Sequence, residues 1–260
     1  MRQAYRTALV TGASSGIGES FARLLAAGGC DLVVVARRAG RLAELAEKLR
    51  AEHQVDVTVL TADLGTPDGV AAVCARLADT AAPIELLVNN AGRSAHGLFV
   101  EQPPDVVAAQ IDLNVLALTR LARAAVGGMV TRGHGGILNV SSMASFTGSP
   151  ASAVYGATKA FVTSLSESLH AELAGTGVHV TALCPGFTRT EFHAANNVDV
   201  GYLPKLAWLD SDDVARAGLA AVAAGRALVV PGLQYKVAAG ATKLLPRAAI
   251  RRMTRAVRQV

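Results

Sequence analysis

The stretch that decides the fold is Ala8-Leu9-Val10-Thr11-Gly12-Ala13-Ser14-Ser15-Gly16-Ile17-Gly18, near the start of the 260-residue chain. An aliphatic strand runs directly into three glycines spaced Gly-x3-Gly-x-Gly, and a helical pattern follows. Glycine lets the backbone turn tightly and approach a pyrophosphate closely, while a helix N-terminus offers free N–H groups and a positive dipole end. Any tight strand–helix turn can carry glycines, but this setting favours nucleotide binding over a purely structural turn.

Strand-like and helix-like segments alternate along the rest of the chain. This alternation is typical of right-handed βαβ crossovers. The predicted fold class is therefore α/β: a doubly wound parallel sheet (Rossmann-like, about seven strands) with helices on both faces. We expect strands near 7–11, 31–36, 55–60, 84–88, 136–141, 178–184 and 227–230. We expect helices near 17–28, 39–53, 67–80, 104–130, 152–174 and 212–224.

The composition fits a domain with an aliphatic core. Hydrophobic residues make up 51% of the chain and aromatic residues only 4%, so Ala, Val, Leu and Ile must fill strands buried on both faces. Three cysteines without a CxxC pair indicate neither a disulfide framework nor a zinc site, and no metal is expected. No uncharged apolar stretch approaches the roughly 20 residues of a membrane span, so the expected location is cytoplasmic.

The net charge of +5 belongs to one end of the chain. Nine lysines and arginines follow Asp213, the last acidic residue, and the rest of the chain has 16 basic against 20 acidic residues. This distribution argues against nucleic-acid binding. In residues 245–260 apolar side chains fall on one arc of a helical projection and arginines on the other. This tail either packs on its own domain or a neighbouring subunit, or makes a peripheral contact with an anionic membrane or an acidic partner.

The end of the second expected strand bears on the choice of cofactor. About 20 residues after a glycine turn, an acid binds the ribose hydroxyl of NAD, whereas an arginine holds the 2′-phosphate of NADP. Here the strand leads into Arg37 and Arg38, and no acid stands at its tip. Two solvated arginines at a helix start are the alternative, but they would oppose the helix dipole. The guanidinium fork suits a phosphate, so we favour NADP(H) over NAD(H).

Tyr155 and Lys159 lie four residues apart at the start of a long expected helix, and therefore on one helical face. A free tyrosine is a poor acid at neutral pH, and we expect the neighbouring ammonium to lower its pKa. Ser142 follows the strand expected at 136–141 and can hold a reacting oxygen near the tyrosine. A Tyr-x3-Lys pair alone could be ordinary helix surface. With Ser142 beside it, the pair predicts proton transfer from Tyr155.

Together these residues make the chain resemble the short-chain dehydrogenase/reductase family, single-domain branch, over roughly residues 4–232. Segments 63–64, 89–92 and 185–190 and Asn114 also match the family's motifs. The resemblance implies a single NADP(H)-binding catalytic domain over 1–232, with 233–260 as a basic amphipathic C-terminal extension of the same domain. It also implies a homodimer or homotetramer built on the helices at 104–130 and 152–174.

The activity implied by the resemblance is hydride transfer between NADP(H) and a small-molecule carbonyl or secondary alcohol. The alternative is a nucleotide-binding sensor or scaffold without turnover, which would not need an intact catalytic set. The implied catalytic residues are Asn114, which positions a water for proton relay, Ser142, Tyr155 and Lys159. The implied cofactor-binding residues are Gly12, Ser14, Ser15, Gly16, Ile17, Gly18, Arg37, Arg38, Asp63, Leu64, Asn90, Ala91, Gly92, Tyr155, Lys159, Pro185, Gly186, Thr188 and Thr190.

Two features depart from the family pattern. Thr188 stands where many members carry Val or Ile, in a contact made largely through the backbone, and the chain runs on past Pro231-Gly232, where many relatives end.

The candidates for lining a substrate pocket are mostly apolar, which favours a substrate with an apolar body. These candidates are His96, Phe99, Ser145, Phe146, Phe192, Tyr202, Leu203 and Trp208.

Overall fold

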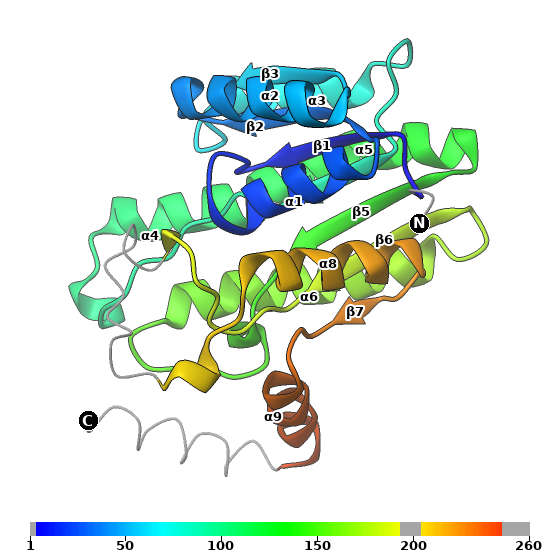
Figure 1. Cartoon of the computed structure of the whole chain (residues 1–260). Helices are drawn as coiled ribbons and strands as arrows, with labels where there is room; N and C mark the ends of the chain where they lie inside the picture. The colour runs from blue at the N-terminus through cyan, green and yellow to red at the C-terminus, as the bar shows by residue number, and fades with distance from the viewer. Residues whose placement is uncertain (1–3, 193–203, 246–260) are drawn as a thin grey trace.

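The computed structural model describes residues 4–192 and 204–245, and a seven-stranded sheet runs through the centre of this part (Figure 1). Every pairing between these strands is parallel, and their spatial order is β3-β2-β1-β4-β5-β6-β7. The order confirms the predicted doubly wound, Rossmann-like sheet. The strands are β1 (Thr7–Thr11), β2 (Asp31–Ala36), β3 (Val57–Thr61), β4 (Leu86–Asn89), β5 (Gly135–Val140), β6 (Val178–Leu183) and β7 (Leu228–Val229).

Helices cover both faces of the sheet (Figure 1). One face is packed by α1 (Gly16–Ala27), α2 (Ala39–His53) and α8 (Ser211–Ala223). The other is packed by α3 (Pro67–Ala78), α5 (Leu118–Arg132) and α6 (Ala153–Glu172). The remaining described elements are α4 (Pro104–Ile111), α9 (Leu233–Leu244) and the short turns η1 (Phe99–Glu101), η2 (Asp112–Ala117), η3 (Met143–Ser145) and η4 (Lys205–Ala207).

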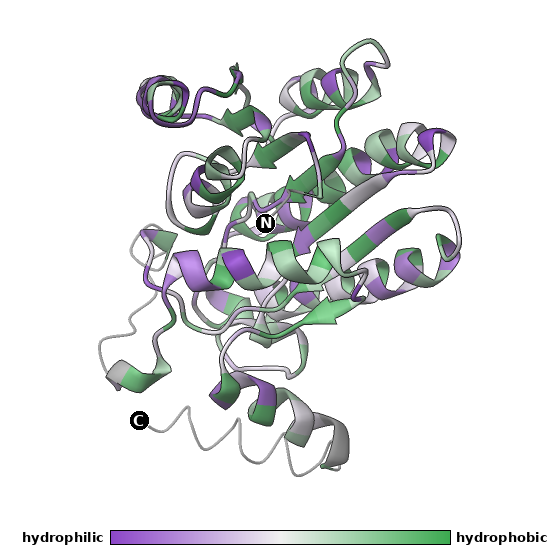
Figure 2. Cartoon of the chain, turned by 45° about the vertical axis from the view of Figure 1, so that its right-hand side comes forward, coloured by the Kyte–Doolittle hydropathy of each residue, from purple (hydrophilic) through white to green (hydrophobic). Residues whose placement is uncertain are grey.

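The two faces of the sheet bury alternate residues of each strand. In β1, Ala8 and Val10 belong to the cluster beneath α1 and α2, whereas Leu9 between them belongs to the cluster beneath α3 and α5. Successive side chains of a strand point to opposite faces, so a strand covered on both sides must be apolar throughout. Figure 2 shows largely hydrophobic strands between helices in which hydrophilic and hydrophobic residues alternate.

The helix expected at 104–130 is confirmed as one stretch, Pro104–Arg132, in which η2 forms a π-helical turn between α4 and α5. Two other expectations are corrected. The last strand, expected at 227–230, is only Leu228–Val229. A helix that was not predicted, α9, packs Ala239 and Tyr235 against the end of β6.

Judged by length and composition alone, the stretch Pro104–Arg132 is the single helix of the described residues that could cross a membrane. It also contacts β4, β5 and α3, as a core helix does. Residues 246–260, which hold most of the predicted amphipathic tail, lie outside the described residues. The arrangement expected there therefore stays a prediction.

Candidate functional site

A cavity of about 890 Å³ opens at the carboxyl ends of the strands, where the order reverses between β1 and β4. In open α/β sheets this switch point is where ligands bind. Most predicted site residues line this cavity, although they come from all parts of the chain. Those that line it are Gly12, Ser14, Ser15, Gly16, Ile17, Arg37, Arg38, Asp63, Leu64, Asn90, Ala91, Gly92, Ser142, Tyr155, Lys159, Pro185, Gly186, Thr188 and Thr190. Gly18 and Asn114 are the predicted site residues that are not part of its lining.

The glycine turn joins β1 to α1 by a backbone path that side chains would block. Gly12 has φ +67°, in the left-handed region that L-residues disfavour. Gly18 allows α1 to pack on the turn, because a Cβ there would overlap the carbonyl oxygen of Gly12. Asn90 closes the turn from β4, since its Nδ2 donates to the Thr11 carbonyl oxygen at 2.9 Å. The turn is thus fixed from two strands, and the α1 N-terminus faces the cavity.

The two arginines at the end of β2 differ in their surroundings. The Arg38 guanidinium donates to Ser14 Oγ at 3.0 Å and to Ser15 Oγ at 2.7 Å, which ties α2 to the glycine turn. Arg37 is exposed at the cavity and forms no side-chain hydrogen bond or ion pair with a described residue. Of these two arginines, Arg37 is therefore the one whose guanidinium has no partner among the described residues.

Sequence reasoning missed two charged residues beside Arg38. Glu191, which follows the segment after β6, accepts from Arg38 Nη1 at 3.0 Å and from Arg41 Nη1 at 2.8 Å. These hydrogen bonds, that from Arg41 first, hold the pKa of the Glu191 carboxyl below its usual range. Arg41 could have been found from the sequence, because it lies in α2 about one helical turn after Arg38. Nothing in the local sequence points to Glu191.

Ser142 and Tyr155 meet at the inner end of the cavity. Ser142 follows β5, and Tyr155 lies in the first turn of α6. Burial raises the pKa of Tyr155, and hydrogen bonding with the Ser142 hydroxyl opposes that rise. The expected lowering of this pKa by Lys159 was wrong, because burial dominates.

Lys159 is buried beneath the tyrosine. Its Nζ lies 5.8 Å from the centre of the Tyr155 ring and donates to the Val140 carbonyl oxygen at 2.8 Å. Burial lowers the pKa of Lys159 to about 8, while nearby Cys184 opposes that shift. A proton on Lys159 is therefore easier to lose than on a free lysine.

Asn114 lies in the π-helical turn η2, where its Oδ1 approaches Gly92 from the same side as Lys159 Nζ. Its Nδ2 donates to the Arg93 carbonyl oxygen at 2.8 Å and to Thr158 Oγ1 at 3.1 Å, and its Oδ1 accepts from Arg93 N at 2.9 Å. The asparagine thus joins the loop after β4 to α6. Its predicted part in a proton relay stays a prediction.

Aromatic residues close the remaining side of the cavity. Phe192 lies 6.2 Å from Tyr155, ring centre to ring centre, and Phe187 and Tyr235 also line the cavity. Tyr235, on α9, was missed: its hydroxyl donates to the Ala207 carbonyl oxygen at 2.6 Å and accepts from Phe187 N at 3.1 Å. In the described part of the molecule, the chain beyond Gly232 thus forms helix α9, which contributes Tyr235 to the cavity wall.

Of the predicted substrate-lining residues that the structure describes, Phe192 is the one that lines the cavity. His96 and Phe99 are exposed, Phe146 packs near the end of β6, and Trp208 lies 6.1 Å from Phe187, ring centre to ring centre. Ser145 is in η3 and does not line the cavity. Tyr202 and Leu203 lie outside the described residues.

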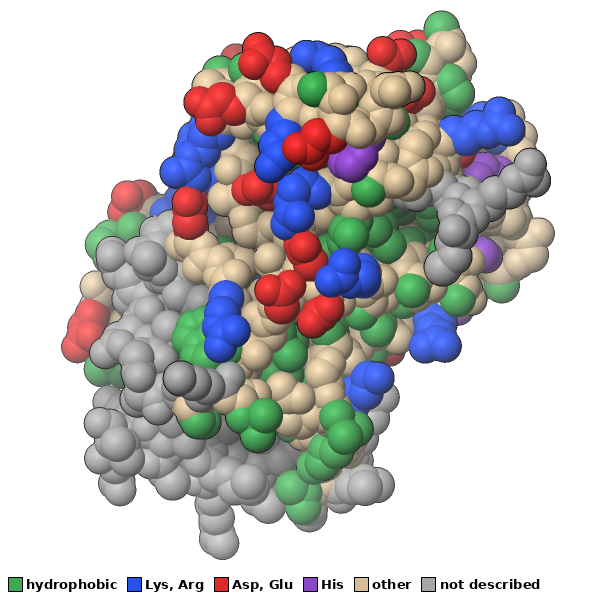
Figure 3. All heavy atoms as spheres, in the orientation of Figure 1, with side chains coloured by type: hydrophobic (Ala, Val, Ile, Leu, Met, Phe, Trp, Pro, Cys, Tyr) green, Lys and Arg blue, Asp and Glu red, His purple; other side chains and the backbone are tan. Residues whose placement is uncertain are grey.

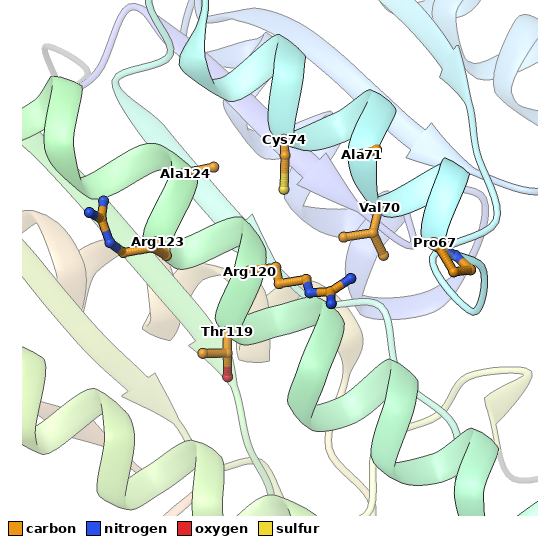
Figure 4. Close-up of a pocket in the computed structure, with 8 residues that line it drawn as sticks. All are labelled: Pro67, Val70, Ala71, Cys74, Thr119, Arg120, Arg123 and Ala124. Atoms are coloured by element: carbon orange, nitrogen blue, oxygen red, sulfur yellow. The ribbon is translucent and has the colours of Figure 1, made fainter.

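A second hollow, of about 470 Å³, lies between α3 and α5. Figure 4 shows its two helical walls, with Cys74 and Val70 on α3 facing Arg120 on α5. It contains none of the predicted site residues. Burial raises the pKa of the Cys74 thiol despite the opposing charge of Arg120, so this hollow holds no activated nucleophile.

The comparisons with known proteins agree on one family. The short chain dehydrogenase family matches residues 6–200. A short-chain dehydrogenase from Sphingobium yanoikuyae, solved in complex with NADPH, is 41% identical with a TM-score of 0.84 over 91% of this chain and 93% of that one. The bulky-bulky ketone specific alcohol dehydrogenase from Comamonas testosteroni is 34% identical with a TM-score of 0.80 over 95% and 97%. Sulfoacetaldehyde reductase 2 from Chromohalobacter salexigens is 38% identical over 189 residues, 71% of this chain and 73% of the relative.

Proposed function

This chain belongs to the short-chain dehydrogenase/reductase family, and from that premise we propose that it transfers a hydride between NADP(H) and a carbonyl or secondary alcohol with a largely apolar body. Membership makes it an oxidoreductase that acts on alcohols or carbonyls with a nicotinamide cofactor. The observation that carries the proposal is the Ser142–Tyr155 hydroxyl pair, which lines the same cavity as the glycine turn.

The residues present fit a dinucleotide phosphate. The turn at Gly12 and Gly18 leaves backbone where a Cβ would intrude, and Arg37 carries an available guanidinium at the same cavity. The glycine turn would hold the pyrophosphate, Arg37 and Arg38 the 2′-phosphate, and Lys159 the ribose hydroxyls. When bound, the nicotinamide supplies or accepts the hydride. The NADPH complex of the relative from S. yanoikuyae supports the preference for NADP(H).

The chain's own residues manage the proton. In the direction of reduction, Ser142 donates a hydrogen bond to the substrate oxygen and holds it near the phenol. Tyr155 gives its proton to that oxygen as negative charge develops there. The raised pKa of Tyr155 keeps it protonated before the reaction, which is the form that can donate. The Lys159 ammonium then stabilises the phenolate that is left.

The substrate side of the cavity favours an apolar body. Met143, Phe187, Phe192 and Tyr235 line it, and such side chains gain free energy by removing apolar surface from water. The bulky-bulky ketone specific relative supports this preference.

The test is oxidation of NADPH and, separately, NADH with ketones and aldehydes of increasing apolar bulk, alongside Tyr155→Phe. We expect activity with NADPH that rises with apolar bulk and collapses in the variant. Faster oxidation of NADH would contradict the cofactor preference, and retained activity in Tyr155→Phe would contradict the assignment of the proton donor. Tight NADPH binding without turnover in either direction would favour a sensor or scaffold.

We also propose that the chain forms a homodimer or homotetramer through the long helices. Ile111 of α4, Leu116 of η2 and Phe161 of α6 expose 44%, 45% and 41% of their surface, although α6 contacts both other elements. Exposed apolar residues on adjacent elements are typical of an interface. Light scattering of the wild type and Phe161→Asp tests the assembly.

Figure 3 shows acidic and basic side chains interspersed on the visible face, which supports a small-molecule enzyme rather than a nucleic-acid binder.

A further inference from the structure

We propose that Glu191 is a specificity-determining residue: its carboxylate occupies the arginines beside the 2′-phosphate site, and NADP(H) must displace it to bind. The inference rests on the proposed preference for NADP(H). It adds a residue that competes with the cofactor phosphate and links the two ends of the cavity.

The geometry of Glu191 is that of an anion in a phosphate site. Both of its carboxylate oxygens accept from Arg41 Nη1, at 2.8 and 2.9 Å, and Oε2 also accepts from Arg38 Nη1 at 3.0 Å. The first turn of α2 contains no acidic residue, and the Arg38 side chain does not cap it. Glu191 therefore supplies, from another part of the chain, the negative charge that this helix N-terminus and the two arginines attract.

A phosphate would use the same donors. Arg38 donates from Nε and Nη2 to Ser14 and Ser15 and from Nη1 to Glu191. A phosphate can therefore replace Glu191 at Nη1 without breaking the bonds to the glycine turn. Arg37 stands beside them and is available. A 2′-phosphate held by Arg37 and Arg38 would lie next to the Glu191 carboxylate. Two negative groups that share one arginine repel each other. NAD(H), which lacks the phosphate, makes no such demand.

The place of Glu191 in the chain gives the competition a second effect. Thr190 before it and Phe192 after it both line the cavity, and the Phe192 ring contacts that of the catalytic Tyr155. The ion pairs of Glu191 thus tie residues 190–192, which lie beside Tyr155, to α2. This start of α2 is where the adenosine half of the cofactor is expected to bind. Displacing Glu191 frees that segment, so the phosphate of the cofactor is sensed at the substrate side.

The experiment compares dissociation constants for NADP⁺ and NAD⁺, measured by calorimetry, in the wild type, Glu191→Gln and Glu44→Gln. Glu44 is an exposed residue of α2 that acts on Arg41 through its charge alone, so its variant matches the change in charge without breaking the ion pairs. Exposed ion pairs are weak and hold the arginines for only part of the time. We therefore expect Glu191→Gln to bind NADP⁺ about three- to tenfold more tightly, with NAD⁺ changed less than about twofold. Glu44→Gln should leave both nearly unchanged.

The coupling has its own readout in Trp208, the single tryptophan of the chain, which lies against Phe187. Leu209, next to Trp208, forms backbone hydrogen bonds with Phe187 and Arg189, shortly before Glu191 in the chain. NADP⁺ should change the tryptophan fluorescence of the wild type more than NAD⁺ does, and Glu191→Gln should remove most of that difference.

Failure of this inference is distinct from failure of the proposed cofactor. If the wild type prefers NADP⁺ and Arg37→Ala weakens that binding, but Glu191→Gln behaves as Glu44→Gln or binds NADP⁺ less tightly, the competition is overturned and the cofactor preference stands. If the wild type prefers NAD⁺, the cofactor preference itself is overturned.

Discussion

Lys159 Nζ donates to the Val140 carbonyl oxygen at 2.8 Å, so a buried ammonium is anchored to the carboxyl end of the interior strand β5. Keeping a charge out of water is costly unless it is fully paired. The lowered pKa of Lys159, about 8, expresses that cost. The site therefore carries an instability that the fold alone does not need.

We expect Lys159→Met to stabilise the protein by about 1–3 kcal/mol near neutral pH while abolishing activity. The pKa of Lys159 is depressed from 10.5 to about 8, so the unfolded chain binds the proton more tightly. The wild type is thus penalised below about pH 8 and gains stability as the pH rises toward 10.5. The advantage of Lys159→Met should shrink over that window. Urea unfolding at several pH values measures it, with exposed Lys48→Met as the control; an advantage that grows with pH would contradict the argument.

Ser142→Ala should lower kcat by about 100-fold and change KM much less, because a donor aimed at the reacting oxygen acts mainly in the transition state. Ser142 Oγ also accepts from Ala144 N at 3.1 Å, so some loss of stability is expected as well. Steady-state kinetics separate the two effects, and Ser142→Thr, which keeps a hydroxyl, should recover part of the rate. A kcat within about threefold of wild type would remove Ser142 from the mechanism.

Gly18→Ala should destabilise the protein by about 3 kcal/mol or more, because the new Cβ meets backbone that cannot move aside. Gly240→Ala is the matched control: nothing lies within 4 Å of the added carbon in α9, and alanine favours a helix by about 0.5–1 kcal/mol. Thermal unfolding of the two variants should therefore shift in opposite directions. Equal shifts would mean that the glycine turn tolerates a side chain.

Tyr235→Phe should raise KM for the substrate several-fold and destabilise the protein by about 1–2 kcal/mol, because Phe187 N and the Ala207 carbonyl oxygen lose their shared partner. Tyr5→Phe serves as the control, since it also loses a hydroxyl bonded to backbone, that of Val222, but lies away from the cavity. It should change stability without changing KM. A rise in KM in both variants would show that the effect is not specific to α9.

The sequence was sufficient for the sheet and much of the cavity because the deciding patterns are local. A strand, its glycine turn and its helix lie within some 20 residues of each other, and parallel strands bring their carboxyl ends to one edge whatever lies between them. Gly12, Arg37 and Tyr155 could therefore be placed together before any distance was known.

What the sequence did not predict depends on distant contacts or on burial. Glu191 stands 150 positions after Arg41 in the chain, and no period or motif joins them. Tyr235 lies on a helix beyond the family's motifs. The direction of the Tyr155 pKa shift was wrong because helical spacing shows which residues are neighbours but not how much water surrounds them.

The π-helical turn η2 has a consequence for how the cavity wall is encoded. A π-turn amounts to one additional residue in an α-helix, and each residue advances the helix by about 100°. Removing one residue from Asp112–Ala117 would restore an unbroken helical phase and rotate α4, which contributes Ala109 to the cavity, relative to α5. The direction in which α4 presents its side chains is thus set by how many residues the turn contains, and substitution of any one of them would leave that phase unchanged.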